Sequence, residues 1–129
     1  MGYEPSKKSR VHIDQRRTID DAFIQEDFPE FKVRKITPIC VNNQDNIYLG
    51  NHYHLSRAEL FYIICGETEF KLGDIESKRR ERYVLSPNQR IYVPAGVAHL
   101  VLPKPLTIIL EISDELFNPK DQINYLIIW

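Results

Sequence analysis

From Gly66 onward, short segments of strand-forming residues alternate with turn residues at short and even intervals. The strands expected here cover residues 68–72, 80–85, 90–93, 99–102 and 106–112. Turn residues separate them, for example Gly-Asp at 73–74 and Ser-Pro-Asn at 86–88. No stretch repeats its apolar residues with a helical period over more than two turns. Together these patterns predict an all-β protein, built as an antiparallel sandwich or barrel.

The two ends of the chain are less regular. Residues 1–9 are polar and basic and are expected to form a flexible tail, which leaves residues 10–129 as one domain. Near the other end, a single helical turn is expected at residues 114–117. The apolar residues at 123–129 need cover, either from the barrel itself or from a partner.

Three further strands are expected before the regular region begins. They cover residues 11–13, 18–25 and 32–41. The apolar residues of the third do not form one clean alternation, so a bulge near Pro38 is predicted.

Two of the four histidines, His52 and His54, stand one residue apart. Side chains at positions i and i+2 of a strand point to the same face, so these two imidazoles are expected side by side. Glu59 follows on the leading edge of an apolar run, and a tight turn at residues 55–58 would bring it beside them. Two imidazoles and a carboxylate directed at one point predict a transition-metal site. His99, which follows the turn residues Pro94-Ala95-Gly96, is the candidate for a further ligand.

These two stretches resemble the paired motifs of the cupin family. The first family motif places H-x-H, then Glu, then Gly, and this chain supplies that order at the family's spacing within residues 46–66. The second places P-x-G two residues before a His, as found within residues 88–103. The chain departs from the pattern at Asn46 and Asn88, which replace the leading glycines, and at Pro103, which replaces the final Asn. Asn tolerates left-handed turns, so the first two changes are mild.

The resemblance implies a double-stranded β-helix, the jelly-roll barrel of cupins, with its ligands pointing inward. It also implies the metal ligands His52, His54, Glu59 and His99. Such a set leaves one or two positions open on one divalent ion. Fe, Mn, Ni, Co and Zn all suit the mixed nitrogen and oxygen donors, so the identity of the metal stays open.

Strand alternation extends this expectation to the walls of the pocket. Tyr48 and Gly50 share the parity of the paired histidines, and Tyr48 offers a phenol for catalysis beside His52 and His54. Further pocket candidates are Phe61, Ile63, Tyr92 and Glu111.

A second resemblance concerns the substrate. Residues 50–54, Gly-Asn-His-Tyr-His, and residues 116–121 are similar to segments of small cupins in bacterial sugar-nucleotide and surface-polysaccharide pathways. It implies a metal-binding enzyme acting on a small oxygenated metabolite, with isomerase or epimerase chemistry on a sugar or sugar nucleotide. Two alternatives stay open. One is a metal-free sugar-nucleotide ketoisomerase that uses His52 and His54 as acid and base. The other is a non-catalytic cupin that binds a small ligand.

Composition narrows the possible partners. The chain has 129 residues, 43% of them hydrophobic, and 17 basic residues against 18 acidic ones, so nucleic-acid binding is not expected. No apolar run is long enough to span a membrane, and the N-terminus lacks the apolar segment of a signal peptide. Cys40 and Cys65 lie in apolar runs and are expected to be reduced core residues of a cytoplasmic protein. The cupin resemblance implies a homodimer, which in small cupins often forms by exchange of N-terminal strands. Residues 11–25 agree with this, because they are strand-like, precede the barrel and carry apolar residues that need cover.

Overall fold

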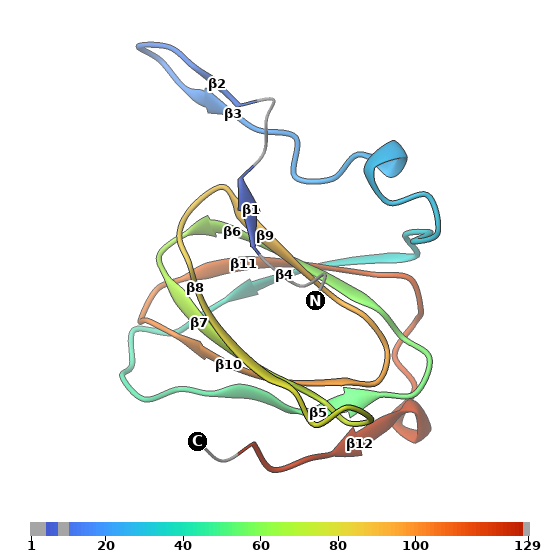
Figure 1. Ribbon diagram of the computed structural model, residues 1–129. Helices are drawn as coiled ribbons and strands as arrows, with labels where there is room; N and C mark the ends of the chain where they lie inside the picture. Colours follow the sequence, from blue (N-terminus) through green and yellow to red (C-terminus); the bar gives the residue numbers. More distant parts are fainter. Residues whose placement is uncertain (1–4, 8–10, 128–129) are drawn as a thin grey trace.

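Figure 1 shows the computed structural model of the protein, which describes residues 5–7 and 11–127. Two five-stranded antiparallel sheets face each other and form a barrel (Figure 1). The first sheet has the order β1 (Ser6–Lys7), β9 (Gln89–Val93), β6 (Glu59–Cys65), β11 (Ile108–Ser113), β4 (Lys35–Cys40). The second has the order β12 (Gln122–Asn124), β5 (Leu49–His54), β10 (Val97–Pro103), β7 (Thr68–Asp74), β8 (Arg80–Leu85). The all-β jelly-roll prediction is confirmed.

The remaining elements lie outside the two sheets. A short hairpin of β2 (His12–Ile13) and β3 (Thr18–Ile19) projects away from the barrel (Figure 1). Within residues 5–7 and 11–127 there are two short 3-10 helices, η1 (Gln25–Asp27) and η2 (Pro119–Asp121). Among the described residues, no helix is long and apolar enough to cross a membrane.

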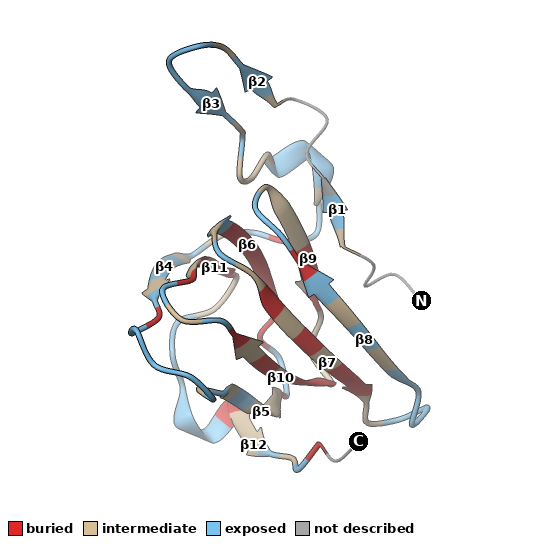
Figure 2. Ribbon diagram, turned by 90° about the vertical axis from the view of Figure 1, so that its left-hand side faces the viewer, coloured by how far each residue is buried: buried red, intermediate tan, exposed pale blue. Residues whose placement is uncertain are grey.

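The apolar core fills the space between the sheets. Figure 2 shows the buried residues concentrated on β6, β7 and β10. Phe70 and Leu72 alternate with partly exposed residues on β7, as expected for a strand with one face on the core. Burying an apolar side chain of this size contributes roughly 1.5–3 kcal/mol, so this cluster is a main source of the barrel's stability. Its ten buried members are Phe61, Ile63, Phe70, Leu72, Leu85, Ile91, Val93, Val97, Val101 and Ile109.

From Glu59 to Ile63, strand β6 is buried on both faces, which explains its run of apolar residues. Phe61 and Ile63 face the core, whereas Leu60 packs with Phe31 in a second cluster on the outer face of the first sheet. Aromatic rings of the N-terminal segment form part of this cover, and the Phe31 and Tyr92 rings meet edge to face at 5.5 Å. The segment between β3 and β4 therefore packs as an irregular cover over β6.

This packing corrects the strand predicted at residues 18–25. Only Thr18–Ile19 forms a strand there. Asp20 turns instead toward the outer face of the first sheet, where it accepts a hydrogen bond from the Tyr62 hydroxyl. Asn88 donates to the same hydroxyl at 2.8 Å. Burial and the Asp20 carboxylate together raise the pKa of Tyr62 to about 12, so the hydroxyl remains a donor at neutral pH.

The bulge predicted near Pro38 is wrong. Pro38 pairs with Leu110 in a regular register along the whole of β4. Strand β4 lies at the edge of its sheet, where a proline is accommodated without a bulge when its nitrogen faces away from the paired strand. The irregular apolar pattern reflects the exposed outer side of an edge strand, where Ile36 is 57% exposed.

Several expectations for the termini also need correction. Part of the expected tail, Ser6–Lys7, forms β1 and pairs with β9, while residues 1–4 and 8–9 lie outside the described residues. No helical turn forms at residues 114–117, and the 3-10 turn lies at Pro119–Asp121 instead. At the C-terminal end, β12 pairs with β5 and Ile127 is buried, whereas Leu126 is exposed. The last two residues of the expected apolar tail, 128–129, lie outside the described residues.

The turns and the cysteines give mixed results. Asn46 and Asn88, which replace motif glycines, adopt the left-handed conformation with φ of 60° and 68°. Gly66 has φ of 89°, and a Cβ there would lie 2.3 Å from the Thr107 hydroxyl, so this turn requires glycine. Cys40 and Cys65 are both free thiols, but Cys40 is exposed, so its predicted place in the core is wrong.

Candidate metal centre

Four predicted ligands meet inside the barrel. His52 and His54 lie on β5, and His99 lies on β10 directly opposite His52. Glu59 is the first residue of β6 and reaches the same point from the other sheet. One ligand atom from each of the four lies within 4.8 Å of the others. His54, Glu59 and His99 are almost fully buried, whereas His52 is partly exposed. The fold therefore brings together all four residues that were predicted as ligands.

Glu59 is the centre of the cluster. Its Oε1 lies 3.1 Å from His54 Nε2 and 3.3 Å from His99 Nε2. The other ring nitrogens have outward partners: His99 Nδ1 is 3.3 Å from the Val97 carbonyl oxygen, and His54 Nδ1 is 3.6 Å from Asp121. Outward contacts of this kind fix which nitrogen points at a metal. The Glu59 Oε1 is buried and accepts no directed hydrogen bond within the described part of the chain.

The electrostatics favour the protonation states that metal binding needs. Burial, together with the neighbouring His99 and His54, lowers the pKa of His52 to about 4, so this imidazole is neutral at pH 7. Burial alone would raise the pKa of Glu59, but the contacts with His54 and His99 outweigh it and hold that pKa far below its ordinary range. Neutral imidazoles and an ionised carboxylate are the forms that bind metals. The buried Oε1 and this donor set fit a divalent transition metal.

The lowered pKa of His52 leads to a prediction for the metal-free protein. The folded pKa of about 4 lies below the 6.5 of an exposed histidine, so the unfolded chain takes up a proton between these values and the folded chain does not. The stability due to His52 is present above pH 6.5 and is lost as pH falls from 6.5 to 4. Urea unfolding in EDTA should show that the free energy of unfolding falls more between pH 7 and pH 5 in the parent than in His52→Gln. An equal fall in both proteins would contradict the lowered pKa of His52.

The fold is shared with a group of solved structures. No family model and no curated protein sequence matches the chain, so the likeness is one of structure. The TDP-fucose-3,4-ketoisomerase of Campylobacter jejuni has a TM-score of 0.78 at 17% identity, over 95% of this chain and 89% of that one. A 3,4-ketoisomerase from Helicobacter canadensis has a TM-score of 0.82 at 17% identity, over 95% of this chain and 90% of that one. An epimerase of Mycobacterium tuberculosis has a TM-score of 0.81 at 18% identity, over 94% of this chain and 67% of that one.

The chain has the cupin fold. The resemblance seen in the two sequence motifs is therefore confirmed at the level of architecture. Identities below 20% show the fold alone and leave the activity of this chain to be argued from its site.

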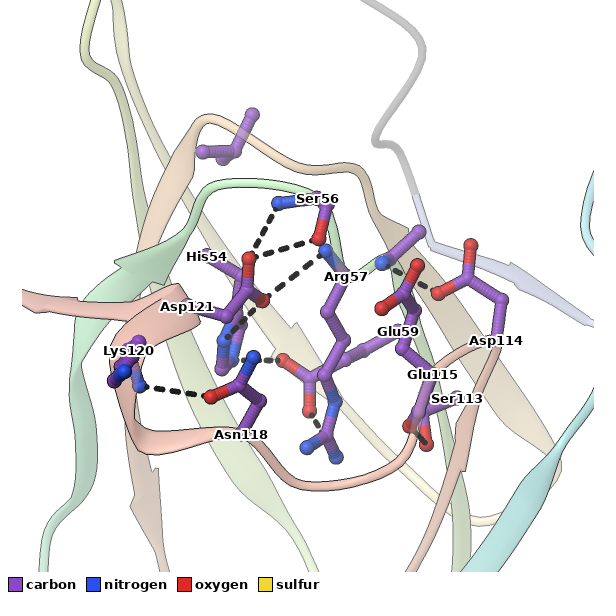
Figure 3. A network of polar contacts seen from close by, with 12 residues as sticks. His54, Ser56, Arg57, Glu59, Ser113, Asp114, Glu115, Asn118, Lys120 and Asp121 are labelled. Carbon is purple, nitrogen blue, oxygen red and sulfur yellow. Dashed lines mark hydrogen bonds and ion pairs between the residues drawn. The ribbon is translucent and has the colours of Figure 1, made fainter.

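A network behind the ligands was not predicted from the sequence (Figure 3). Asp121, in η2, accepts hydrogen bonds from the Ser56 amide and hydroxyl, both at 2.8 Å, and from the Arg57 amide at 3.3 Å. These bonds lower the pKa of Asp121 despite its burial, so it is ionised beside His54. The 3-10 turn that holds Asp121 is capped by Asn118, whose side chain accepts from the Lys120 amide. The Asn-Pro pair at 118–119 was the available sequence signal for this turn.

Tyr48, predicted as a catalytic residue of the pocket, is not brought to the site. Its side chain is 64% exposed, and Leu49 lines the inner cavity in its place. The reason lies in the next two residues, because Gly50 and Asn51 both have positive φ, at 81° and 69°. The pairing of β5 with β10 shifts register at this point, so the alternation that leads back from His52 is broken.

The other pocket candidates are placed as follows. Gly50 lines the cavity and is required there, since a Cβ would lie 2.7 Å from the His99 carbonyl oxygen. Phe61 and Glu111 also line it. Ile63 belongs to the core, and Tyr92 packs on the outer face of the first sheet. Burial and the neighbouring Glu59 raise the pKa of Glu111 to about 7.

Two cavities meet at the site. An inner cavity of about 60 Å³ lies on the apolar side, and a mouth of about 260 Å³ lies on the polar side. The inner cavity has room for only a few water-sized groups. The mouth is the space for a larger ligand. Three side chains line both cavities: His52, Glu59 and Glu111.

Proposed function

We propose that this cupin is a metal-dependent enzyme that isomerises or epimerises a sugar or sugar nucleotide. The observation that carries the proposal is the convergence of four ligand atoms within 4.8 Å at the junction of two cavities. The structural likeness to sugar-nucleotide ketoisomerases and epimerases supports the substrate class. The bound metal would be one of Fe, Mn, Ni, Co or Zn, since a site of three imidazoles and one carboxylate suits each.

In this proposal, one set of residues would hold the metal ion and another would line the path of the substrate. His52, His54, Glu59 and His99 would hold the ion, and its Lewis acidity would polarise a carbonyl next to an acidic C–H. The mouth admits the substrate, and the inner cavity excludes all but its smallest groups. Glu111 lines both cavities and offers an acceptor for a substrate hydroxyl beside the ligands.

A metal-free ketoisomerase is the second candidate, and the ketoisomerases among the structural neighbours favour it. In that case His52 or His54 would act as the acid or base, because both stand at the mouth of the barrel. A cupin that binds a small ligand without catalysis is the remaining alternative.

One experiment separates the three candidates. The purified protein is incubated in D₂O with TDP-4-keto-6-deoxyglucose, a ligand of one of the neighbouring ketoisomerases, and proton NMR follows exchange of the C–H beside the carbonyl. Exchange that stops after chelation and returns with added metal is the expected result. Exchange that persists after chelation and is lost in His52→Asn or His54→Asn would establish the metal-free reaction. Binding without exchange would indicate a ligand-binding protein.

A homodimer is part of the proposal. The projecting β2–β3 hairpin exposes Ile13 and Ile19, at 71% and 39%, and apolar side chains in this position need cover. His12, on the same hairpin, is also exposed. Light scattering at micromolar concentration is expected to give twice the chain mass of 15.2 kDa. The variant Ile13→Ser/Ile19→Ser should give the monomer mass, and a monomeric parent would refute the dimer.

A cytoplasmic location belongs to the same proposal. Both cysteines are free thiols, which suits a reducing compartment. Fractionation of the native host cell would test this location.

A further inference from the structure

Arg57 is buried directly behind the ligand cluster. It lies in the loop between β5 and β6, and its side chain is only 6% exposed. Arginine is almost never buried to this extent unless it is paired with acidic groups. Its Nη2 lies 3.3 Å from Glu59 Oε2 and also contacts the Glu111 carboxylate. One guanidinium nitrogen therefore bridges two carboxylates.

The two oxygens of Glu59 have different partners. Oε1 faces His54 and His99. Oε2 is held by Arg57, and Figure 3 shows Glu59 between His54 and Arg57. A carboxylate can bind a metal through one oxygen or through both. An oxygen that is engaged by a guanidinium is turned away from the point where the imidazole nitrogens meet.

We propose that Arg57, held in place by Glu111, is a positioning residue that makes Glu59 a one-oxygen ligand and so keeps a coordination position open for the substrate. The inference rests on the proposed function, because it requires a metal at the cluster. It assigns to Arg57 and Glu111 a role that the motif residues alone do not have.

Simple electrostatics gives the opposite expectation for the removal of Arg57. A cation 3.3 Å from an oxygen of Glu59 would repel a divalent metal bound at the cluster, so its loss would tighten metal binding if charge alone mattered. If Arg57 positions Glu59, its loss weakens binding, because the carboxylate is no longer fixed. Partners behind the ligands of a metal site typically change affinity by about 10–100-fold. The direction of the change therefore distinguishes positioning from charge.

The experiment measures Co²⁺ binding to the full chain by calorimetry and by visible absorption. Arg57→Met is expected to weaken binding about 10–100-fold. Its Co²⁺ bands should also lose intensity, because a released Oε2 lets Glu59 bind through both oxygens and raises the coordination number. Glu111→Gln should shift both readings in the same direction, and Arg57→Lys should lie between Arg57→Met and the parent.

Two further variants keep the test independent of folding. Arg57→Met/Glu111→Met removes Arg57 together with its second partner, so Glu111 is not left buried without the guanidinium, and it should show the same weakening and the same spectral change. Arg82→Met removes an arginine from a pair with Glu69 on the barrel surface and should leave both readings unchanged. Circular dichroism would check that each variant is folded.

The outcomes separate this inference from the proposed function. A parent that binds no Co²⁺ overturns the metal proposal and the inference together. A parent that binds Co²⁺, with the folded Arg57→Met and double variants matching its affinity and spectrum, overturns the inference alone. Tighter binding in these variants would also overturn it, because Arg57 would then oppose metal binding instead of positioning Glu59 for it.

Discussion

If the protein binds metal as we propose, a Glu59→Ala/His99→Ala variant is expected to lose that metal completely. The change removes the only carboxylate of the cluster and the only ligand on β10, which leaves two imidazoles on one strand. Two neutral ligands from a single strand do not compete with water and buffer for a divalent ion as four convergent ligands do. Mass spectrometry of the untagged parent should find about one equivalent of metal, because the four residues form a single site, and none in the variant.

A matched control is available on the surface. His12→Ala/Glu67→Ala removes the same two residue types, but His12 lies on the projecting hairpin and Glu67 pairs with Lys104. This control should keep the metal content of the parent. If the parent holds no metal even after reconstitution, the proposal that this protein is metal-dependent is refuted. The paired histidines His52 and His54 then become the acid and base groups to test.

Asp121→Ala is expected to have the second large effect, on both stability and metal affinity. Asp121 accepts three hydrogen bonds from Ser56 and Arg57 and lies 3.6 Å from His54 Nδ1. Its removal leaves buried donors without an acceptor, at a cost of about 1–3 kcal/mol in the free energy of unfolding. It also frees the ring of His54, and the loss of such a partner typically weakens metal binding about 10–100-fold. Urea unfolding and calorimetric metal titration measure the two effects.

The controls distinguish the carboxylate from the turn. Asp121→Asn keeps one acceptor oxygen and should lose less of both quantities than Asp121→Ala. Asp14 also accepts two backbone N–H bonds, from Arg16 and Arg17, in the surface hairpin. Asp14→Ala should leave metal affinity unchanged, and equal metal affinity in the parent and Asp121→Ala would exclude a role for Asp121 at the site.

The ligand cluster was predictable because fixed spacings in the chain become fixed positions in a strand. His52 and His54 share a face at any register, and the turn after them returns Glu59 to the same region. Asp121 and Glu111 were different, because their roles depend on pairings with residues more than fifty positions away. Hydrophobic periodicity contains no information about such contacts.

The incorrect predictions have local physical causes. Tyr48 was assigned to the pocket by alternation, but the left-handed residues Gly50 and Asn51 interrupt that alternation. Pro38 was read as a bulge, although an edge strand accepts proline without one. Residues 18–25 were read as one strand, whereas Asp20 bonds to Tyr62 and ends the extended segment early. In each case one residue's backbone or side-chain contact overrode a regular pattern.

The placement of Glu59 on one wall of the barrel and the three histidines on the other has a mechanical consequence. An ion at their meeting point would link two sheets that also pack against each other through the apolar core. A bound ion would then slow amide hydrogen exchange in both β6 and β10, although these strands belong to different sheets. The rigidity of this barrel would therefore vary with the supply of metal around it.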